Sequence, residues 1–250
     1  MKKNFFAHLI GAALLALPLV GAAAGGAGIK LDSAPVNLKD KASLQRGAKT
    51  FVNYCLNCHQ ASMMRYSRLT DLELTEQQIK DNLMFATDKI GDTMTTSLSS
   101  KDAKAWFGGV PPDLSVIARS RGADWLYTFL RSYYRDDKSP TGWNNRAFPA
   151  VGMPHVLHEL QGAQAWQQVG EKKGHGGAME PVMKLVLTQP GAMKPVEYDQ
   201  FVGDLVNYLV FMGEPAAAKR TQLGVLVLFF LTLMLVVAML LKKEYWKDVK

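Results

Sequence analysis

The segment Cys55-Leu56-Asn57-Cys58-His59 carries the most specific chemistry in this sequence. In a Cys-x-x-Cys-His segment the two thiols add across the two vinyl groups of haem, and the adjoining imidazole binds the iron. The chain has only two cysteines, and both lie in this segment. The pattern therefore predicts one haem c, attached covalently through Cys55 and Cys58, with His59 as its proximal ligand.

A thioredoxin-like dithiol is the competing interpretation, because exported oxidoreductases also use two cysteines at this spacing. That motif follows a strand in a βαβ unit, whereas the apolar residues between Leu44 and Val52 recur here at helical spacing. They predict a helix from Leu44 to Cys58. Two cysteines also exclude a disulfide-dense scaffold and a zinc site with three thiolates. The helical context favours haem.

A second axial ligand must come from elsewhere in the chain, and the twelve methionines make counting uninformative. A distal ligand needs a loop held stiffly against the ring. The segment Gly152-Met153-Pro154 has this character, because glycine permits close backbone approach and proline restricts the chain after the ligand. Met183 and Met193 stand near prolines too, so the residues alone leave three candidates. An axial methionine would raise the reduction potential.

The two ends of the chain have the patterns of a leader and an anchor. Lys2 and Lys3 precede a short apolar run and an Ala-x-Ala site, so residues 1–24 are predicted to be a cleaved signal peptide. Near the other end, Leu223 to Leu241 is apolar apart from one threonine. As a helix this stretch covers roughly 28 Å, the thickness of the hydrocarbon core. Residues 222–241 are therefore predicted to span a membrane.

Charge gives the predicted topology. Four lysines follow the apolar stretch and two positive residues precede it, which favours a cytoplasmic tail at 242–250. Residues 25–221 are then a periplasmic domain of a bacterial inner-membrane protein. Of the net charge of +7, the leader holds +2 and the tail +2, which leaves +3 for the exported domain. This small surplus implies no basic face for nucleic acid, so no nucleic-acid partner is expected.

Composition and periodicity predict a mainly α fold. The chain is 48% hydrophobic and 20% charged, which excludes an intrinsically disordered protein. Further helices are predicted at about 75–86, 123–134 and 197–212, and the apolar stripe of the last one is expected in the core. Residues 182–188 are prone to form a strand between Gly- and Pro-rich joints. The region 157–195 is expected to form a surface hairpin, to which we assign no function.

The order of the motifs resembles that of the cytochrome c1 family, the membrane-anchored haem subunit of the cytochrome bc1 (ubiquinol–cytochrome c reductase) complex, in its bacterial type. The resemblance covers most of the exported domain and the tail. It rests on Arg46-Gly47 before the haem motif, Arg65-Tyr66, Pro111-Pro112-Asp113-Leu114-Ser115 continuing to Arg119-Ser120-Arg121-Gly122, Phe148-Pro149-Ala150-Val151-Gly152-Met153-Pro154, and Asp199 to Pro215 running into the tail helix. The Pro-Pro-Asp-Leu-Ser segment and the C-terminal anchor discriminate best.

The resemblance implies roles for single residues. It makes His59 and Met153 the axial ligands and Arg121 the partner of a haem propionate. Pro112 is expected in the wall beside the ring. Trp125 stands where an aromatic residue flanks the haem in relatives, with Trp in place of Tyr. The region 157–195 has no clear counterpart in the mitochondrial members.

The function implied by the resemblance is one-electron transfer within a multi-subunit enzyme. The fold expected is a c-type cytochrome haem domain with one C-terminal transmembrane helix. The electron would arrive from the Rieske iron–sulfur protein and leave to a cytochrome c acceptor during ubiquinol oxidation, and the tail helix would pack against cytochrome b. The alternative is a membrane-tethered monohaem cytochrome c that serves another oxidase or reductase. Proteins of that kind often retain an N-terminal anchor.

Overall fold

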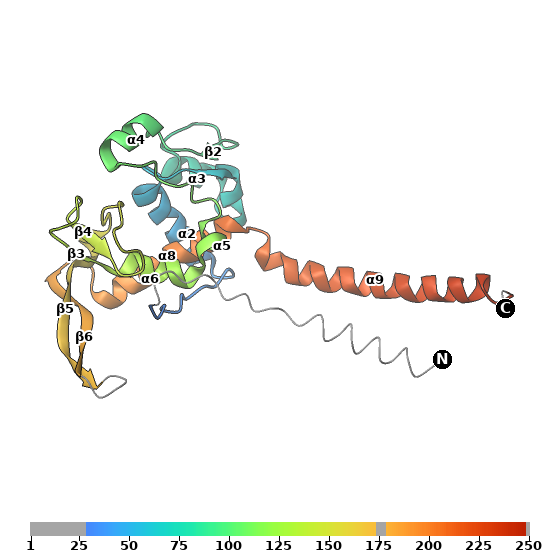
Figure 1. Cartoon of the computed structure of the whole chain (residues 1–250). Coiled ribbons are helices and arrows are strands. Elements are labelled where there is room, and N and C mark those ends of the chain that lie inside the picture. Colours follow the sequence, from blue (N-terminus) through green and yellow to red (C-terminus); the bar gives the residue numbers. More distant parts are fainter. Residues whose placement is uncertain (1–28, 174–178, 249–250) are drawn as a thin grey trace.

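The structure is a computed structural model that describes residues 29–173 and 179–248, so the predicted leader lies outside the described residues. The fold is mainly helical, as predicted, and the elements of its body surround a hydrophobic core (Figure 1). The helices are α2 (Lys41–Thr50), α3 (Glu76–Leu83), α4 (Ser100–Phe107), α5 (Ile117–Arg121), α6 (Ala123–Arg131), α7 (His158–Gln161), α8 (Pro195–Gly213) and α9 (Ala217–Tyr245), with a π-helical turn η2 (Phe51–Cys55) and a 3₁₀ segment η3 (Tyr66–Leu72).

Strands form three antiparallel pairs within the described residues. The pairs are β1 (Ala61–Arg65) with β2 (Thr93–Met94), β3 (Tyr133–Arg135) with β4 (Trp143–Asn145), and β5 (Gly162–Lys173) with β6 (Met179–Pro190). The first two pairs are short, but each adds buried side chains to the core: Ala61, Met64 and Met94 from the first pair, and Tyr133 and Trp143 from the second.

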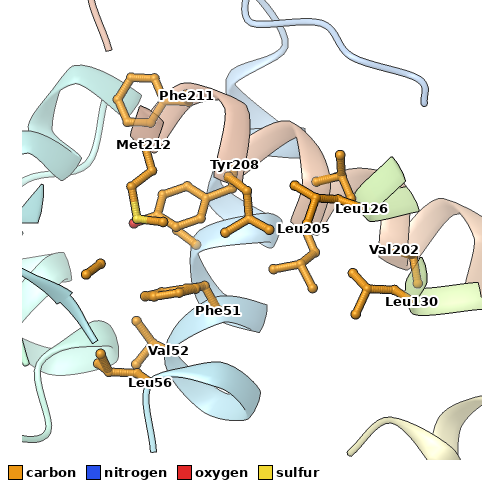
Figure 2. Packing of buried hydrophobic residues seen from close by; sticks show 14 of the residues in the cluster. Phe51, Val52, Leu56, Leu126, Leu130, Val202, Leu205, Tyr208, Phe211 and Met212 are labelled. Carbon is orange, nitrogen blue, oxygen red and sulfur yellow. The ribbon is translucent and has the colours of Figure 1, made fainter. Parts of the chain in front are cut away.

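The crossing of α2 and α8 forms the centre of the core, so the first and last helices of the domain pack together. Gly47 permits the close approach, because a Cβ there would lie 2.1 Å from the carbonyl oxygen of Asp204. Figure 2 shows Tyr208 of α8 facing Phe51, with ring centroids 5.7 Å apart. Four residues of the stripe predicted on α8 are buried, namely Leu205, Tyr208, Leu209 and Met212. The fifth, Phe201, is partly buried and packs against the core.

Polar contacts fix the register of this crossing. Arg46 of α2 donates two hydrogen bonds to the carboxylate of Asp204, at 2.6 and 3.0 Å. The fully buried Asn207 donates to the Asn37 carbonyl at 2.9 Å and to the Ser43 hydroxyl at 3.0 Å, and accepts from the Asn37 N–H at 3.0 Å. A buried amide is costly when its partners are missing, so this network selects one arrangement of the helices.

The predicted surface hairpin is present and longer than the strand expected at 182–188. β5 and β6 pair from Gly162 opposite Pro190 to Lys173 opposite Met179. The guanidinium carbon of Arg146 lies 3.6 Å from the ring centroid of Trp166. This cation–π contact holds the base of the hairpin against the body of the domain. The hairpin projects on the side of the body away from α9 (Figure 1).

α9 leaves the body as one long helix that contains the whole predicted span 222–241 (Figure 1). It has 29 residues, and its most apolar window has a mean hydropathy of 3.0 with no share of that window buried. A helix of this length and composition can cross the hydrocarbon core of a bilayer. A lipid environment accounts for an apolar surface that the rest of the described chain leaves uncovered.

The helices predicted at 123–134 and 75–86 both end early. The helix expected at 123–134 stops at Arg131, because Tyr133–Arg135 pairs with β4 instead. The helix expected at 75–86 is α3, which begins after the Thr75 capping box and ends at Leu83. For the helix expected at 123–134, pairing with a strand further along the chain overrides the helical periodicity.

Candidate haem site

The two cysteines and His59 lie on a tight loop at the end of the first helix. α2 passes into the π-helical turn η2, so the helix predicted to reach Cys58 ends at Cys55. Beyond it, the backbone N–H groups of Cys58 and His59 both donate to the Cys55 carbonyl, at 3.1 and 2.8 Å. Single π-helical turns are frequent at functional sites. Here the turn and the loop that follows it carry both thiols and the imidazole.

The His59 ring is buried, and a backbone hydrogen bond fixes its tautomer. Its Nδ1 lies 2.8 Å from the carbonyl oxygen of Pro112, so Nδ1 carries the proton and donates it to that carbonyl. Nε2 then keeps its lone pair for a metal. Burial lowers the pKa of His59, and the hydrogen bond to Pro112 offsets this only in part. The ring is therefore neutral at pH 7, which is the form that binds iron.

A cleft opens beside this histidine. Most of its wall is apolar, and its lining includes one histidine, one cysteine, one methionine and one tyrosine. The lining residues are Tyr54, Cys58, His59, Phe107, Gly109, Val110, Pro111, Pro112, Gly152, Met153, Pro154 and Val156.

Met153 is the candidate methionine that shares this cleft with His59. Met183 lies in β6 and Met193 stands just before α8, and neither lines the cleft. Pro112 also lines it, as expected for a wall residue. The structure thus brings together four of the predicted site residues, and Cys55 lies on the adjoining turn.

Asn145 of β4 supports the loop that carries Met153. This buried side chain accepts hydrogen bonds from the N–H groups of Ala147 at 2.8 Å and Phe148 at 3.2 Å. Its amide nitrogen donates to the carbonyl of Phe129 in α6 at 2.7 Å. The loop is therefore tied to a core helix. Asn145 was not among the predicted site residues. Adjacent asparagines before a loop are a signal that could have indicated it, since asparagine side chains bond to the backbone in turns.

Two further contacts hold the same loop. The Asn144 side chain accepts from the N–H of Ala150 at 2.9 Å, where Ala150 has a φ of 58°. The Tyr133 hydroxyl donates to the carbonyl of Met153 itself at 3.3 Å. His155 stacks on Tyr133 with ring centroids 4.7 Å apart and is buried, so it is a packing residue. The left-handed alanine is a strained position that its surroundings hold in place.

The thiols do not have the character of a dithiol oxidoreductase. Cys55 packs against the core, and its burial, with a smaller effect of the nearby Cys58, raises its pKa to about 12. A reactive dithiol needs a nucleophile with a lowered pKa. A helix also leads into the motif, where a thioredoxin-like unit would have a strand. The competing interpretation is therefore disfavoured.

Two predicted residues lie outside the cleft lining. Trp125 of α6 is buried and stacks on Phe129 with centroids 4.9 Å apart. Arg121 is exposed at the end of α5, with its guanidinium carbon 5.0 Å from the ring centroid of Trp125 and 5.8 Å from that of Phe148. No carboxylate in the described ranges forms an ion pair with Arg121. Its N–H groups are available to an anionic group.

This set of residues fits haem c. The cleft offers one neutral imidazole and one thioether, which are common axial ligands of haem iron. Two thiols adjoin it, and an arginine lies against Phe148 in the loop that leads to the thioether. Within residues 29–173 and 179–248, no group of three or more His, Cys, Asp and Glu side chains could hold a bare metal ion. The donors present suit an iron that brings its own macrocycle.

Comparison with known proteins decides the family. The model of the cytochrome C1 family matches residues 32–249. The chain belongs to the cytochrome c1 family. It is 47% identical to cytochrome c1 of Allochromatium vinosum, with 96% of this chain and 98% of that protein covered. It is 28% identical to cytochrome c1 of Rhodospirillum rubrum, over 84% of this chain and 83% of that protein. A Nitrosomonas europaea protein named ammonia monooxygenase gamma subunit is 52% identical, over 95% and 96%.

Cytochrome c1 is the membrane-anchored, electron-carrying subunit of the bc1 complex, where it stands with cytochrome b and the Rieske protein, and it binds haem c. The predictions of haem c, of electron transport and of the bc1 complex are thus confirmed. The alternative of a monohaem cytochrome that serves another oxidase is not favoured. The match to a cytochrome c1 family model also confirms the predicted fold class, with an apolar C-terminal helix able to span a membrane.

Proposed function

We propose that this chain takes one electron at a time from the Rieske iron–sulfur protein and passes it to a cytochrome c acceptor. The observation that carries this proposal is the convergence of His59 and Met153 on one largely apolar cleft. Haem c supplies the iron that takes up and returns the electron. Two protein ligands leave no position open for a substrate, which suits electron transfer better than bond-making chemistry.

The residues around the cleft have distinct roles in this proposal. Cys55 and Cys58 attach the cofactor covalently, which keeps it in place through every redox cycle. His59 presents Nε2 because its Nδ1–H is held by Pro112 at 2.8 Å. Met153 supplies a thioether from a loop tied to the core, and thioether ligation raises the reduction potential. Pro112 also forms part of the wall.

Arg121 and Trp125 act at the border of the site. The guanidinium of Arg121 pairs with a haem propionate, since a carboxylate partly removed from water gains from a charge-assisted partner. Trp125 holds that guanidinium through its ring face, at 5.0 Å. Trp125 thus supports the arginine and does not itself wall the cleft.

The proposed topology follows the charges at the chain ends. The segment 1–24 is removed as a signal peptide, 25–221 is the periplasmic haem domain, and 222–241 anchors it in the inner membrane of a bacterium. Support comes from the exposed apolar helix α9 and from the lysines in the tail at 242–250, which favour the cytoplasmic side. Single cysteines introduced at position 250 and in the β5–β6 hairpin can be treated with a membrane-impermeant thiol reagent. Their labelling tests on which side of the membrane each position lies.

A substitution at the proposed distal ligand tests the site. Met153→Ala should abolish the weak near-infrared band of methionine-ligated ferric haem and lower the reduction potential. Met183→Ala is the matched control, because Met183 lies in β6 and away from the cleft, and it should leave both unchanged. An unaltered band in Met153→Ala would show that another residue is the ligand.

Purification of the tagged full chain in mild detergent tests the assembly. Co-isolation of a b-type haem protein and a Rieske iron–sulfur protein is expected. A role as a monooxygenase subunit is the second candidate, and the name of the 52% identical Nitrosomonas protein, ammonia monooxygenase gamma subunit, favours it. Co-isolation of oxygenase subunits without a b-type haem protein would support that candidate instead.

A further inference from the structure

Asp113 directly follows the proline whose carbonyl holds the His59 ring. Its Oδ2 accepts hydrogen bonds from the N–H and the hydroxyl of Ser62, at 2.9 and 2.6 Å, and its Oδ1 accepts from the N–H of Ser115 at 2.7 Å. Burial acts to raise the pKa of Asp113, but the hydrogen bonds from Ser115 and Ser62 outweigh it and hold the pKa below its ordinary value. The carboxylate is therefore ionised at pH 7, and its bonds are charge-assisted.

Two more hydrogen bonds join the same pieces of chain. The N–H of Leu114 donates to the Gln60 carbonyl at 2.9 Å, and the N–H of Met63 donates to the hydroxyl of the buried Ser115 at 3.0 Å. With the two from Ser62, four hydrogen bonds fasten segment 112–115 to segment 60–63, which follows His59 directly. The two segments lie about fifty residues apart in the chain, so these four bonds, together with the one from His59 to Pro112, set their register locally.

We propose that Asp113 is a positioning residue for the proximal iron ligand: it fastens segment 112–115 beside His59 and so keeps the Pro112 carbonyl at hydrogen-bond distance from Nδ1. The inference rests on the proposed role of His59. A hydrogen bond from Nδ1–H to a carbonyl orients the ring and raises the basicity of Nε2. A more basic ligand favours the ferric state, so loosening the Asp113 bonds raises the reduction potential.

The test measures the reduction potential and the ferric EPR g-values of the full chain in its purified complex. Asp113→Asn should shift the ferric–ferrous equilibrium about tenfold toward the ferrous state, the low end of the effects of removing a second-shell partner of a metal-bound histidine. For one electron this is about 59 mV. The g-values should change as well, because they follow the orientation of the axial imidazole.

Matched variants separate position from charge. Asp113→Glu keeps the charge and displaces the carboxylate by one methylene, so positioning predicts a shift in the same direction. Ser115→Ala removes the acceptor for the Met63 N–H but keeps the charge of Asp113. It should shift the reduction potential by less than the Asp113 variants do. Asp137→Asn removes an exposed carboxylate and should change neither reading.

Several results would overturn the proposal. Wild-type potentials and g-values in both Asp113→Asn and Asp113→Glu would do so. A shifted reduction potential in Asp113→Asn, with no shift in Asp113→Glu or Ser115→Ala, would show that the effect comes from the lost charge and not from positioning. If Asp113→Asn fails to assemble, Ser62→Ala and Ser115→Ala decide, and wild-type readings in both refute positioning. A wild-type chain without c-type haem would instead refute the proposed function.

Discussion

Replacement of Gly47 by alanine should loosen the helix crossing on which the haem motif stands. A Cβ at this position would lie 2.1 Å from the carbonyl oxygen of Asp204 and 2.6 Å from the Cβ of Tyr208. Ordinary contacts of a Cβ begin near 3.4 Å, so α2 and α8 would have to separate by the difference, about 1.3 Å. Two of the three nearest atoms belong to the Asp204 backbone and the third is the Cβ of Tyr208, whose position the backbone fixes, so none of them can rotate away.

The expected cost combines opposing effects. Overpacking of a close-packed core typically costs about 1–3 kcal/mol. Alanine regains about 1 kcal/mol over glycine within a helix. Separation of the helices would also stretch the bonds of Arg46 to Asp204 and of Asn207 to Ser43, at about 1 kcal/mol each. Together these give a loss of about 3 kcal/mol, which for a domain of this size lowers Tm by about 6–12 °C.

Thermal unfolding of the full chain in detergent, followed by circular dichroism in the Soret region, measures this loss. The Soret signal reports the haem domain and is insensitive to α9. Gly224→Ala is the matched control, because a Cβ at that helical position meets nothing within 4 Å, and its Tm should stay at the wild-type value. A Gly47→Ala chain as stable as the wild type, or more stable, would show that helix propensity outweighs the crowding and would refute the reasoning.

Three further predictions concern other parts of the site. Asn207→Leu should lower the free energy of unfolding, measured by chemical denaturation, by about 2–3 kcal/mol, because the buried polar partners of the amide lose their hydrogen bonds. A smaller loss would contradict the role given to this network. The pKa of Asp113 in the folded state lies below its ordinary value of 3.8, so its contribution to stability is present above pH 3.8 and is lost as the pH falls through the lower value. Asp113→Asn should therefore flatten the acid dependence of Tm below pH 4, and an unchanged slope would count against the assigned bonds. Cys55→Ser should give the pyridine haemochrome spectrum of a haem with a single thioether, whereas a wild-type spectrum would place the attachment elsewhere.

Local periodicity predicted the elements whose determinants lie within a few residues. The stripe on α8 repeats through Leu205, Tyr208 and Met212, so the burial of this helix could be predicted without knowledge of its partner. The Gly- and Pro-rich joints likewise predicted the hairpin. The haem motif and the candidate Met153 were also local signals, since each rests on neighbouring residues.

Features that depend on distant partners could not be predicted. Tyr133 belongs to a helical pattern, yet it pairs with Asn145 in a sheet and bonds to the Met153 carbonyl. The role of Asp113 depends on Ser62, 51 positions earlier.

The long separation of Arg46 from Asp204, 158 residues, has a consequence for biogenesis. At 5–20 residues per second, synthesis of the intervening chain takes on the order of ten seconds or more. During this interval α2 has been synthesised without α8, the helix against which it packs in the folded domain. Because Cys55 packs against that core, chains arrested before residue 195 should react faster with a thiol reagent than full-length chains, and equal rates would argue against such a window. The order of elements along the chain therefore delays completion of the core until α8 has been made.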